Sequence, residues 1–147
     1  MSRRLIVRVL VLVAVASVLV GAQALSAVAQ PTSATAELGQ AATLVAKGAA
    51  IQVPVTYSCS SDATFGAIQL FATERVGGNR TASGSGSTFD VTCDGAQHTA
   101  LVTVTSGNGI AFHQGTALVQ GSFQACDPDG LCLTVPLSGT VRVTNKK

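Results

Sequence analysis

The chain has 147 residues, of which 47% are hydrophobic and 11% are charged, and its formal net charge is +2. Three of its nine basic residues, Arg3, Arg4 and Arg8, lie at the N-terminus, and the rest of the chain carries six basic and seven acidic residues, a net charge of −1. Because that remainder contains no Lys/Arg cluster, it lacks the basic patch that nucleic-acid binding requires, and this distribution excludes that class of function.

The N-terminal segment has the three parts of a secretory signal peptide. The arginines precede the apolar run VLVLVAVASVLV at residues 9–20, and AVA at 27–29 supplies the small residues of a cleavage site. As a helix this run spans about 18 Å, whereas an uncleaved membrane anchor would have to cross about 30 Å of hydrocarbon. We therefore expect a leader at residues 1–29 and a secreted, extracellular domain at residues 30–147, with no stable membrane insertion.

Beyond the leader, apolar residues recur with a period of two, which is typical of half-buried strands. In AIQVPVTYSC, residues 50–59, the apolar face runs from Ile51 to Cys59, and Pro54 on the other face indicates an edge strand or a bulge. Similar runs lie at residues 65–75, 87–93, 98–106, 116–126 and 131–143, with shorter candidates at 35–38 and 42–46. We expect SGSGS at 83–87 to be a flexible loop or a poor edge strand.

Dipeptides that favour tight turns separate these runs. They are Gly77-Gly78, Asp94-Gly95, Asn108-Gly109 and Asp129-Gly130. Seven to nine short strands with turns at this spacing predict a single all-β domain, an antiparallel β-sandwich.

The four cysteines separate by strand face. Cys59 continues the apolar face of its strand, and Cys93 continues an alternation that includes Phe89, so both thiols are expected to point inward. Cys126 and Cys132 are out of step with the apolar residues around them and are expected to point outward. Since facing residues of an antiparallel pair lie about 4.5–5.5 Å apart, we predict disulfides within each face, Cys59 with Cys93 and Cys126 with Cys132.

The segment CDPDGLC, residues 126–132, combines two thiols with two carboxylates. In an oxidising compartment we expect its thiols to form a bridge that closes a hairpin loop, with Pro128 and Gly130 as turn formers. A redox switch and a calcium site are the alternatives. However, the thiols lack C-x-x-C spacing, and Asp127-x-Asp129-Gly130 lacks the further oxygen ligands of a calcium loop. We expect neither a metal nor a cofactor.

Groups suited to catalysis are few. His98 and His113 are the only histidines, and neither lies in a motif such as G-x-S-x-G or H-E-x-x-H. Asp94, His98 and one of the many serines could form a hydrolytic set, but no spacing specifies it. We therefore expect that the protein is not an enzyme.

Four segments together carry a resemblance. YSC at 57–59, TFDVTCDGAQH at 88–98, FHQGTALVQGSFQAC at 112–126 and LC at 131–132 resemble a group of small exported actinobacterial domains of uncharacterised function. The resemblance covers about residues 50–143 and implies two disulfides on an immunoglobulin-like sandwich, without implying functional residues. The architecture is also loosely similar to that of enediyne-carrying apoproteins, which are secreted two-disulfide sandwiches.

Two functions follow from these expectations. The first is a non-catalytic module that binds a cell-envelope component or an extracellular protein through a sheet face or loops. The alternative is a small-molecule carrier with an apolar cleft. The run at 65–75 favours the carrier because it is apolar on both faces, and a strand of this kind lies under a second layer or lines a cleft. The candidate ligand-binding residues are Phe65 and Phe71.

Overall fold

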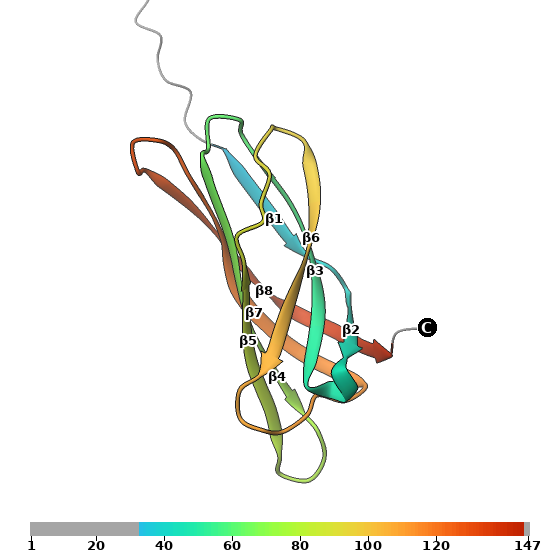
Figure 1. The fold of residues 1–147 in the computed structure, drawn as a ribbon. Coiled ribbons are helices and arrows are strands. Elements are labelled where there is room, and N and C mark those ends of the chain that lie inside the picture. The colour runs from blue at the N-terminus through green and yellow to red at the C-terminus, as the bar shows by residue number, and fades with distance from the viewer. Residues whose placement is uncertain (1–32, 146–147) are drawn as a thin grey trace, which may run out of the picture. The chain divides into compact units, whose positions relative to one another are not determined.

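The computed structural model describes residues 33–145, so the expected leader at 1–29 and its cleavage site lie outside the described residues. Within this range the chain forms strands and one 3₁₀ turn (η1, Ala46–Gly48), and no α-helix (Figure 1). The eight strands are β1 (Ala34–Leu38), β2 (Ala41–Val45), β3 (Ala50–Cys59), β4 (Phe65–Arg75), β5 (Thr81–Thr88), β6 (Gln97–Ser106), β7 (Gly115–Cys126) and β8 (Cys132–Asn145). The predicted all-β class and strand number are confirmed.

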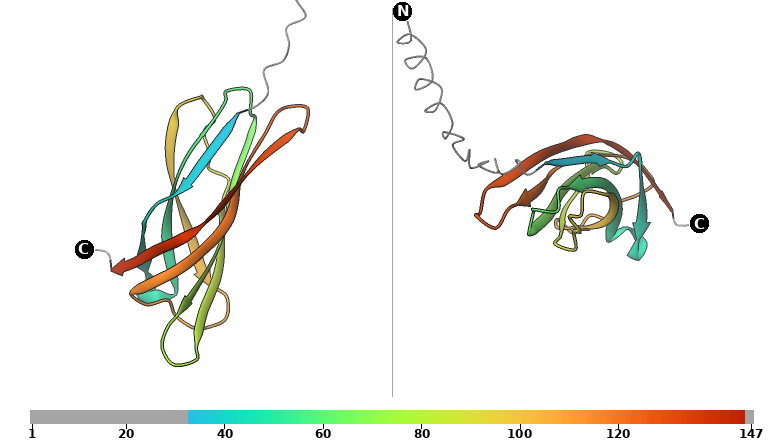
Figure 2. Two further views of the ribbon diagram at one scale, coloured as in Figure 1. Left: turned by 180° about the vertical axis from the view of Figure 1, so that it is seen from behind. Right: turned by 90° about the horizontal axis from the view of Figure 1, so that it is seen from above.

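The strands form one sheet that closes on itself, whereas the sequence predicted a sandwich. The order of hydrogen-bonded neighbours is β1-β3-β2-β8-β7-β4-β5-β6, and β6 also pairs with β3. Seven strands, β2 to β8, therefore make a closed ring, which is seen in cross-section in the right panel of Figure 2. Strand β1 is the exception, because it pairs only with the second half of β3 while β2 pairs with the first half.

Closure depends on the SGSGS segment, which is part of β5 rather than a loop. Strand β5 pairs with β4 along its whole length, but its ladder pairs with β6 are limited to Gly84 and Ser85. A Cβ atom at Gly84 or Gly86 would lie 2.2 or 2.0 Å from the carbonyl oxygen of Thr105 or Thr103 on β6. Because only glycine allows so close an approach of two backbones, the two glycines let β5 and β6 meet.

Pro54 lies within β3, which has neighbours along both edges. Its carbonyl accepts a hydrogen bond of 2.8 Å from the N–H of Gly39, at the point where β1 has ended and β2 has not begun. The missing N–H of a proline therefore falls at a break in the neighbouring strand, where no ladder bond is lost. The predicted edge or bulge is in fact this break.

The interior of the ring is filled by apolar side chains, as in other small barrels. Alternate residues of β3 are buried from Ile51 to Cys59, as the sequence predicted. The largest fully buried side chains are two phenylalanines, three isoleucines or leucines and seven valines: Phe112, Phe123, Ile51, Ile68, Leu70, Val53, Val55, Val102, Val104, Val119, Val141 and Val143. Phe112 comes from the β6–β7 loop, so this loop is packed on the core.

The predicted strand at 87–93 is wrong. Pairing of β5 with β4 ends at Thr88, and residues 89–96 leave the sheet. Phe89, which the alternation placed inward, is 69% exposed, while Val91 and Cys93 still pack on the core from outside any strand. The alternation correctly indicated that Val91 and Cys93 face the core, but these residues belong to a loop that packs against the barrel and not to a strand.

Because neighbouring strands are mostly antiparallel, successive connections alternate between two ends of the barrel. The lower end of Figure 1 holds turn 46–49, loops 76–80 and 107–114, and the end of β8. The upper end holds loops 60–64, 89–96 and 127–131. Only β2 and β8 run parallel, through residues 41–44 and 142–145.

Candidate functional site

The segment CDPDGLC, residues 126–132, is a bridged hairpin loop. Cys126 and Cys132 face each other across β7 and β8 and form a disulfide, which confirms the predicted pairing. One carboxylate oxygen of Asp127 accepts the backbone N–H groups of Asp129 (3.0 Å) and Leu131 (2.9 Å). Asp127 therefore closes the turn as a local cap.

The second predicted disulfide, Cys59–Cys93, joins the end of β3 to loop 89–96. The hydroxyl of Tyr57 accepts the N–H of Thr92 at 3.1 Å, and the N–H of Gly95 donates to the carbonyl of Cys59 at 2.8 Å. Residues 33–145 contain no free cysteine. Two disulfides indicate an oxidising environment for the folded protein.

Asp94 and His98, the two members of the imagined hydrolytic set, do lie together. His98 Nε2 is 2.8 Å from Asp94 Oδ1, and the imidazole lies 5.8 Å from the ring of Tyr57. The hydrogen bond from His98, followed by that from the Ala96 N–H, holds the pKa of Asp94 below its usual value. No side-chain hydrogen bond within residues 33–145 joins His98 to a serine, and the Asp94–His98 contact links loop 89–96 to the start of β6.

The two candidate ligand-binding residues lie on the outer face of β4. Phe65 is 44% exposed and Phe71 is 51% exposed, while Ile68, Leu70 and Ala72 of the same strand are buried in the core. Phe65 contacts Phe89, with ring centroids 6.1 Å apart. These two rings border a hollow of about 220 Å³, and Phe71 is not among its lining residues. The double-sided apolarity of β4 therefore reflects core packing on one face and exposed rings on the other.

The surroundings of Phe65 and Phe71 carry no charge. We call the outward-facing residues of β4 from Phe65 to Thr73, together with their outward-facing neighbours on β5 and β7, the uncharged face, because all of them are apolar or neutral. They are Phe65, Ala67, Gln69, Phe71, Thr73, Ser83, Ser85, Ser87, Leu118, Gln120, Ser122 and Gln124. Arg75, which ends β4 with the same orientation, borders this face and is not part of it. The sheet below them is continuously paired, so it presents these side chains on a rigid surface.

A buried carboxylate at the lower end was missed by the sequence analysis. Glu74 is only 3% exposed, and its Oε2 accepts the backbone N–H of His113 at 2.8 Å. Its position in β4 has the same parity as Leu70 and Ala72, so strand alternation already placed it inside. Glu74 thus ties loop 107–114 to the barrel.

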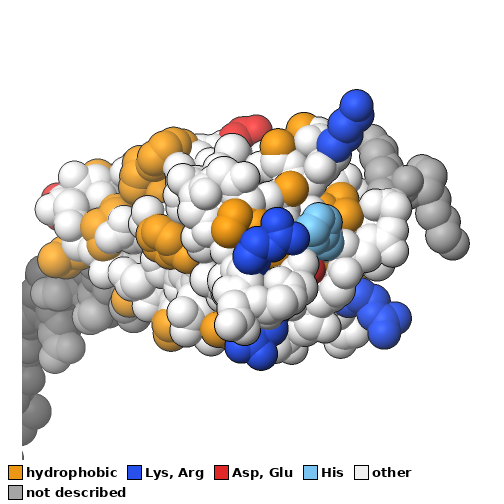
Figure 3. All heavy atoms as spheres, turned by 90° about the horizontal axis from the view of Figure 1, so that it is seen from below, with side chains coloured by type: hydrophobic (Ala, Val, Ile, Leu, Met, Phe, Trp, Pro, Cys, Tyr) orange, Lys and Arg blue, Asp and Glu red, His pale blue; other side chains and the backbone are white. Residues whose placement is uncertain are grey.

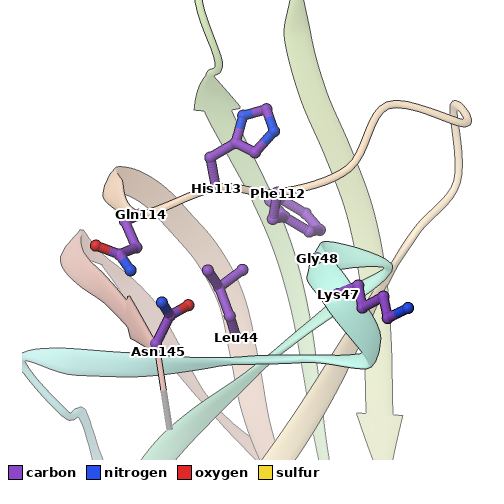
Figure 4. Close-up of a pocket in the computed structure, with 7 residues that line it drawn as sticks. All are labelled: Leu44, Lys47, Gly48, Phe112, His113, Gln114 and Asn145. Atoms are coloured by element: carbon purple, nitrogen blue, oxygen red, sulfur yellow. The ribbon is translucent and has the colours of Figure 1, made fainter.

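The same loop borders a hollow of about 580 Å³ at the lower end (Figure 4). Gln114 and Asn145 lie side by side next to Leu44, while Lys47 extends outward from the other side. The full lining is Leu44, Lys47, Gly48, Phe112, His113, Gln114 and Asn145. Its volume is within the range of about 300–1,000 Å³ for ligand pockets, and its lining combines apolar Leu44 and Phe112 with polar side chains.

Turn 46–49 shapes this hollow through an unusual backbone. Ala46 and Lys47 have φ angles of 49° and 55°, in the left-handed region that costs non-glycine residues energy. Gly48 follows at 88°, and its carbonyl accepts the N–H of Phe112 at 2.8 Å. A Cβ at Gly48 would lie 2.2 Å from the carbonyl oxygen of Phe112, so glycine is required there. No signal in the sequence predicted left-handed Ala46 and Lys47.

The described residues give two negative findings. No group of three or more His, Cys, Asp and Glu side chains in residues 33–145 could hold a metal ion. In the same range, no helix has the length and apolar character needed to cross a membrane.

Comparisons with protein-family models, curated proteins and solved structures find no match. The chain is therefore described by its own features as a closed all-β domain with two disulfides. The resemblance to exported actinobacterial domains stays a prediction.

Proposed function

We propose that the protein is an exported, non-catalytic binding module, and that an uncharged surface of an extracellular protein or cell-envelope component docks on its uncharged face. The observation that carries this proposal is the exposure of Phe65 and Phe71 on a face without charge. Aromatic side chains supply large contact areas at low cost in side-chain entropy and are frequent anchors of binding surfaces.

The surroundings of the two rings support this proposal. Gln69 and Gln120, the neighbours of Phe71 along and across the strands, have amides that both donate and accept hydrogen bonds. A charged partner would lose hydration on this face without gaining an opposite charge, so the chemistry favours a neutral partner. Export is proposed from the leader sequence together with the two disulfides.

A small-molecule carrier is the second candidate. It is favoured by the hollow between Phe65 and Phe89, although 220 Å³ is below the range of about 300–1,000 Å³ for ligand pockets. Phe65 is the residue that this function requires, and Phe71 is not.

We also propose that the barrel is a modified immunoglobulin-like sandwich. Strand β3 lies between β1 and β6, and β4, β7 and β8 are neighbours in that order, as in the two sheets of the immunoglobulin plan. The modification is β5, which pairs with both β4 and β6 and so joins the two sheets. An experimental structure in which β5 pairs with β6 alone would open the ring between β4 and β5 and contradict the closed barrel, although β2 would still pair with both β3 and β8.

The test of the binding module uses Phe65→Ser and Phe71→Ser. Leu101→Ser is the matched control because Leu101 is 61% exposed and lies on β6, outside the uncharged face. Binding is measured by co-sedimentation with the insoluble envelope fraction of the producing cells, and by crosslinking to their secreted proteins from a photoreactive residue at position 71 or 101.

We expect both phenylalanine variants to weaken binding by about tenfold or more, as loss of an aromatic anchor typically does, while Leu101→Ser binds like the parent. All three should unfold within about 0.5 kcal/mol of the parent, since exposed substitutions have small effects. Equal loss in Leu101→Ser, or no binding by the parent, would contradict the proposal. A parent that binds an apolar dye, with the dye lost only in Phe65→Ser, would favour the carrier.

A further inference from the structure

The basic side chains of the barrel lie at one end of it although they are scattered in the sequence. Each belongs to the lower end: one in turn 46–49, two around loop 76–80 and one at the end of β8, and all are exposed. They are Lys47, Arg75, Arg80 and Arg142. We call this surface the basic end, and Figure 3 shows Lys, Arg and His side chains spread across it.

Strand topology explains why the sequence did not reveal this surface. Because most neighbouring strands are antiparallel, connections that are distant in the sequence reach the same end of the barrel. The carboxylates at the opposite, upper end are Asp62, Asp90, Asp94, Asp127 and Asp129. A near-neutral chain thus has two oppositely charged ends, and the absence of a sequence cluster did not mean the absence of a basic patch.

No carboxylate of the described residues forms an ion pair with the cations of the basic end. The single ion pair of residues 33–145 is His98–Asp94 at the upper end. Glu74 is the one carboxylate at the lower end, and it is buried and hydrogen-bonded to the His113 N–H. The four cations therefore face solvent without a carboxylate partner in the described part of the chain.

The hollow of about 580 Å³ lies at this end, where one of the four cations, Lys47, lines it together with neutral hydrogen-bonding groups. Gln114 and Asn145 present amides, which donate to and accept from hydroxyl groups, and Lys47 extends beside them from its left-handed turn. Cations combined with amides match a ligand that carries both negative charges and hydroxyls.

We propose that the basic end is a second binding site, for a hydrophilic anionic glycan whose sugars carry carboxylate or phosphate groups. The acidic groups face Lys47 and the arginines, and the sugar hydroxyls face Gln114 and Asn145. A bilayer fits less well because none of the seven exposed large apolar side chains lies in turn 46–49, loop 76–80, loop 107–114 or residues 142–145. Four cations are also a small footprint for nucleic acid.

The test compares two variants with the same net charge. The basic-end variant replaces the four cations by glutamine: Lys47→Gln, Arg75→Gln, Arg80→Gln and Arg142→Gln. The control variant adds four carboxylates to exposed positions of the upper end: Ser61→Glu, Thr64→Glu, Gln97→Glu and Leu131→Glu. Fluorescent polygalacturonate is the probe, neutral dextran is the blank, and titrations are run at low and high salt.

We expect the parent to bind polygalacturonate with an affinity that falls steeply with salt, and not to bind dextran. The basic-end variant should bind about tenfold more weakly or not at all, while the control stays within about threefold of the parent. Phe65→Ser should bind like the parent, because Phe65 lies at the opposite end of β4 from Arg75; this separates failure of the two proposals.

Four outcomes would overturn this assignment. Equal loss in both variants would mean that only net charge matters. Tighter binding of phosphatidylglycerol vesicles, or of duplex DNA, than of polygalacturonate would identify a different partner. Salt-sensitive self-association of the parent, abolished in the basic-end variant and strengthened in the control, would show that the basic end meets the acidic end of a second copy.

Discussion

The loops at the two ends of the barrel are held in place by different interactions. At the upper end, two disulfides, the Asp127 cap and the Asp94–His98 pair hold the loops. At the lower end, noncovalent contacts do this work. Phe112 is buried in the core, Gly48 accepts the Phe112 N–H, and Glu74 accepts the His113 N–H.

This difference in how the loops are held goes with a difference in which of their side chains are exposed. Covalent closure allows the upper loops to expose Phe89 and Leu131, because the bridges hold them without burial. The lower loops must bury a large ring to stay in place, and what they leave at the surface is polar and cationic. At the lower end, therefore, a buried ring holds the loop on the core, and the exposed cations form no ion pair within residues 33–145.

The largest expected effect comes from the lower end. Phe112→Ala removes a fully buried ring from the loop that covers the core and should cost about 3–5 kcal/mol in the free energy of unfolding, measured by denaturant melts. Leu101→Ala, at an exposed position, is the control and should change it by less than about 0.5 kcal/mol. A cost for Phe112→Ala near that of the control would mean that loop 107–114 is not packed on the core.

At the upper end, the two bridges should contribute unequally. Cys59→Ala with Cys93→Ala opens a loop of sequence separation 34 and should cost about 3.8 kcal/mol by the loop-entropy relation. Cys126→Ala with Cys132→Ala opens one of separation 6 and should cost about 2.4 kcal/mol. Both double variants are compared with the parent in denaturant melts. Equal costs, or a larger cost for the short bridge, would show that loop entropy does not govern this end.

Most of the strands could be predicted because alternation in the sequence reports which face is buried. β3 and β4 begin and end at the predicted residues, and the parity of Cys59 helped to identify its partner. Alternation failed for 87–93, since a loop held by a disulfide and packed on Gly66 buries Val91 without pairing. Alternation also did not predict barrel closure, because closure depends on the close approach of the β5 and β6 backbones that Gly84 and Gly86 allow.

The candidate sites were predicted less completely. Phe65 and Phe71 were identified as the candidate ligand-binding residues of a carrier; both are exposed on the outer face of β4, and of the two only Phe65 borders the hollow beside Phe89. The alternation in β4 places Glu74 on the buried face, with Leu70 and Ala72, but burial of this carboxylate was not predicted. The basic end required topology, because Lys47 and Arg142 are brought to one surface only through the parallel pairing of β2 with β8.

The smallest expected effect concerns the pH dependence of the upper end. Because the hydrogen bond from His98 lowers the pKa of Asp94, the carboxylate stabilises the folded state above the usual pKa of an aspartate, and this contribution is lost as the pH falls through the lowered pKa. Asp94→Asn should therefore melt slightly below the parent near neutral pH, and the difference should shrink at strongly acidic pH, where the Asp94 carboxylate is protonated and its charge no longer contributes. Lys47→Gln, at the other end, is the control. Its melting temperature should differ from the parent by the same amount at both pH values. A difference for Asp94→Asn that is unchanged by acid would show that the Asp94–His98 contact does not contribute to folding, leaving the Cys59–Cys93 bridge and the Tyr57 hydroxyl to hold loop 89–96.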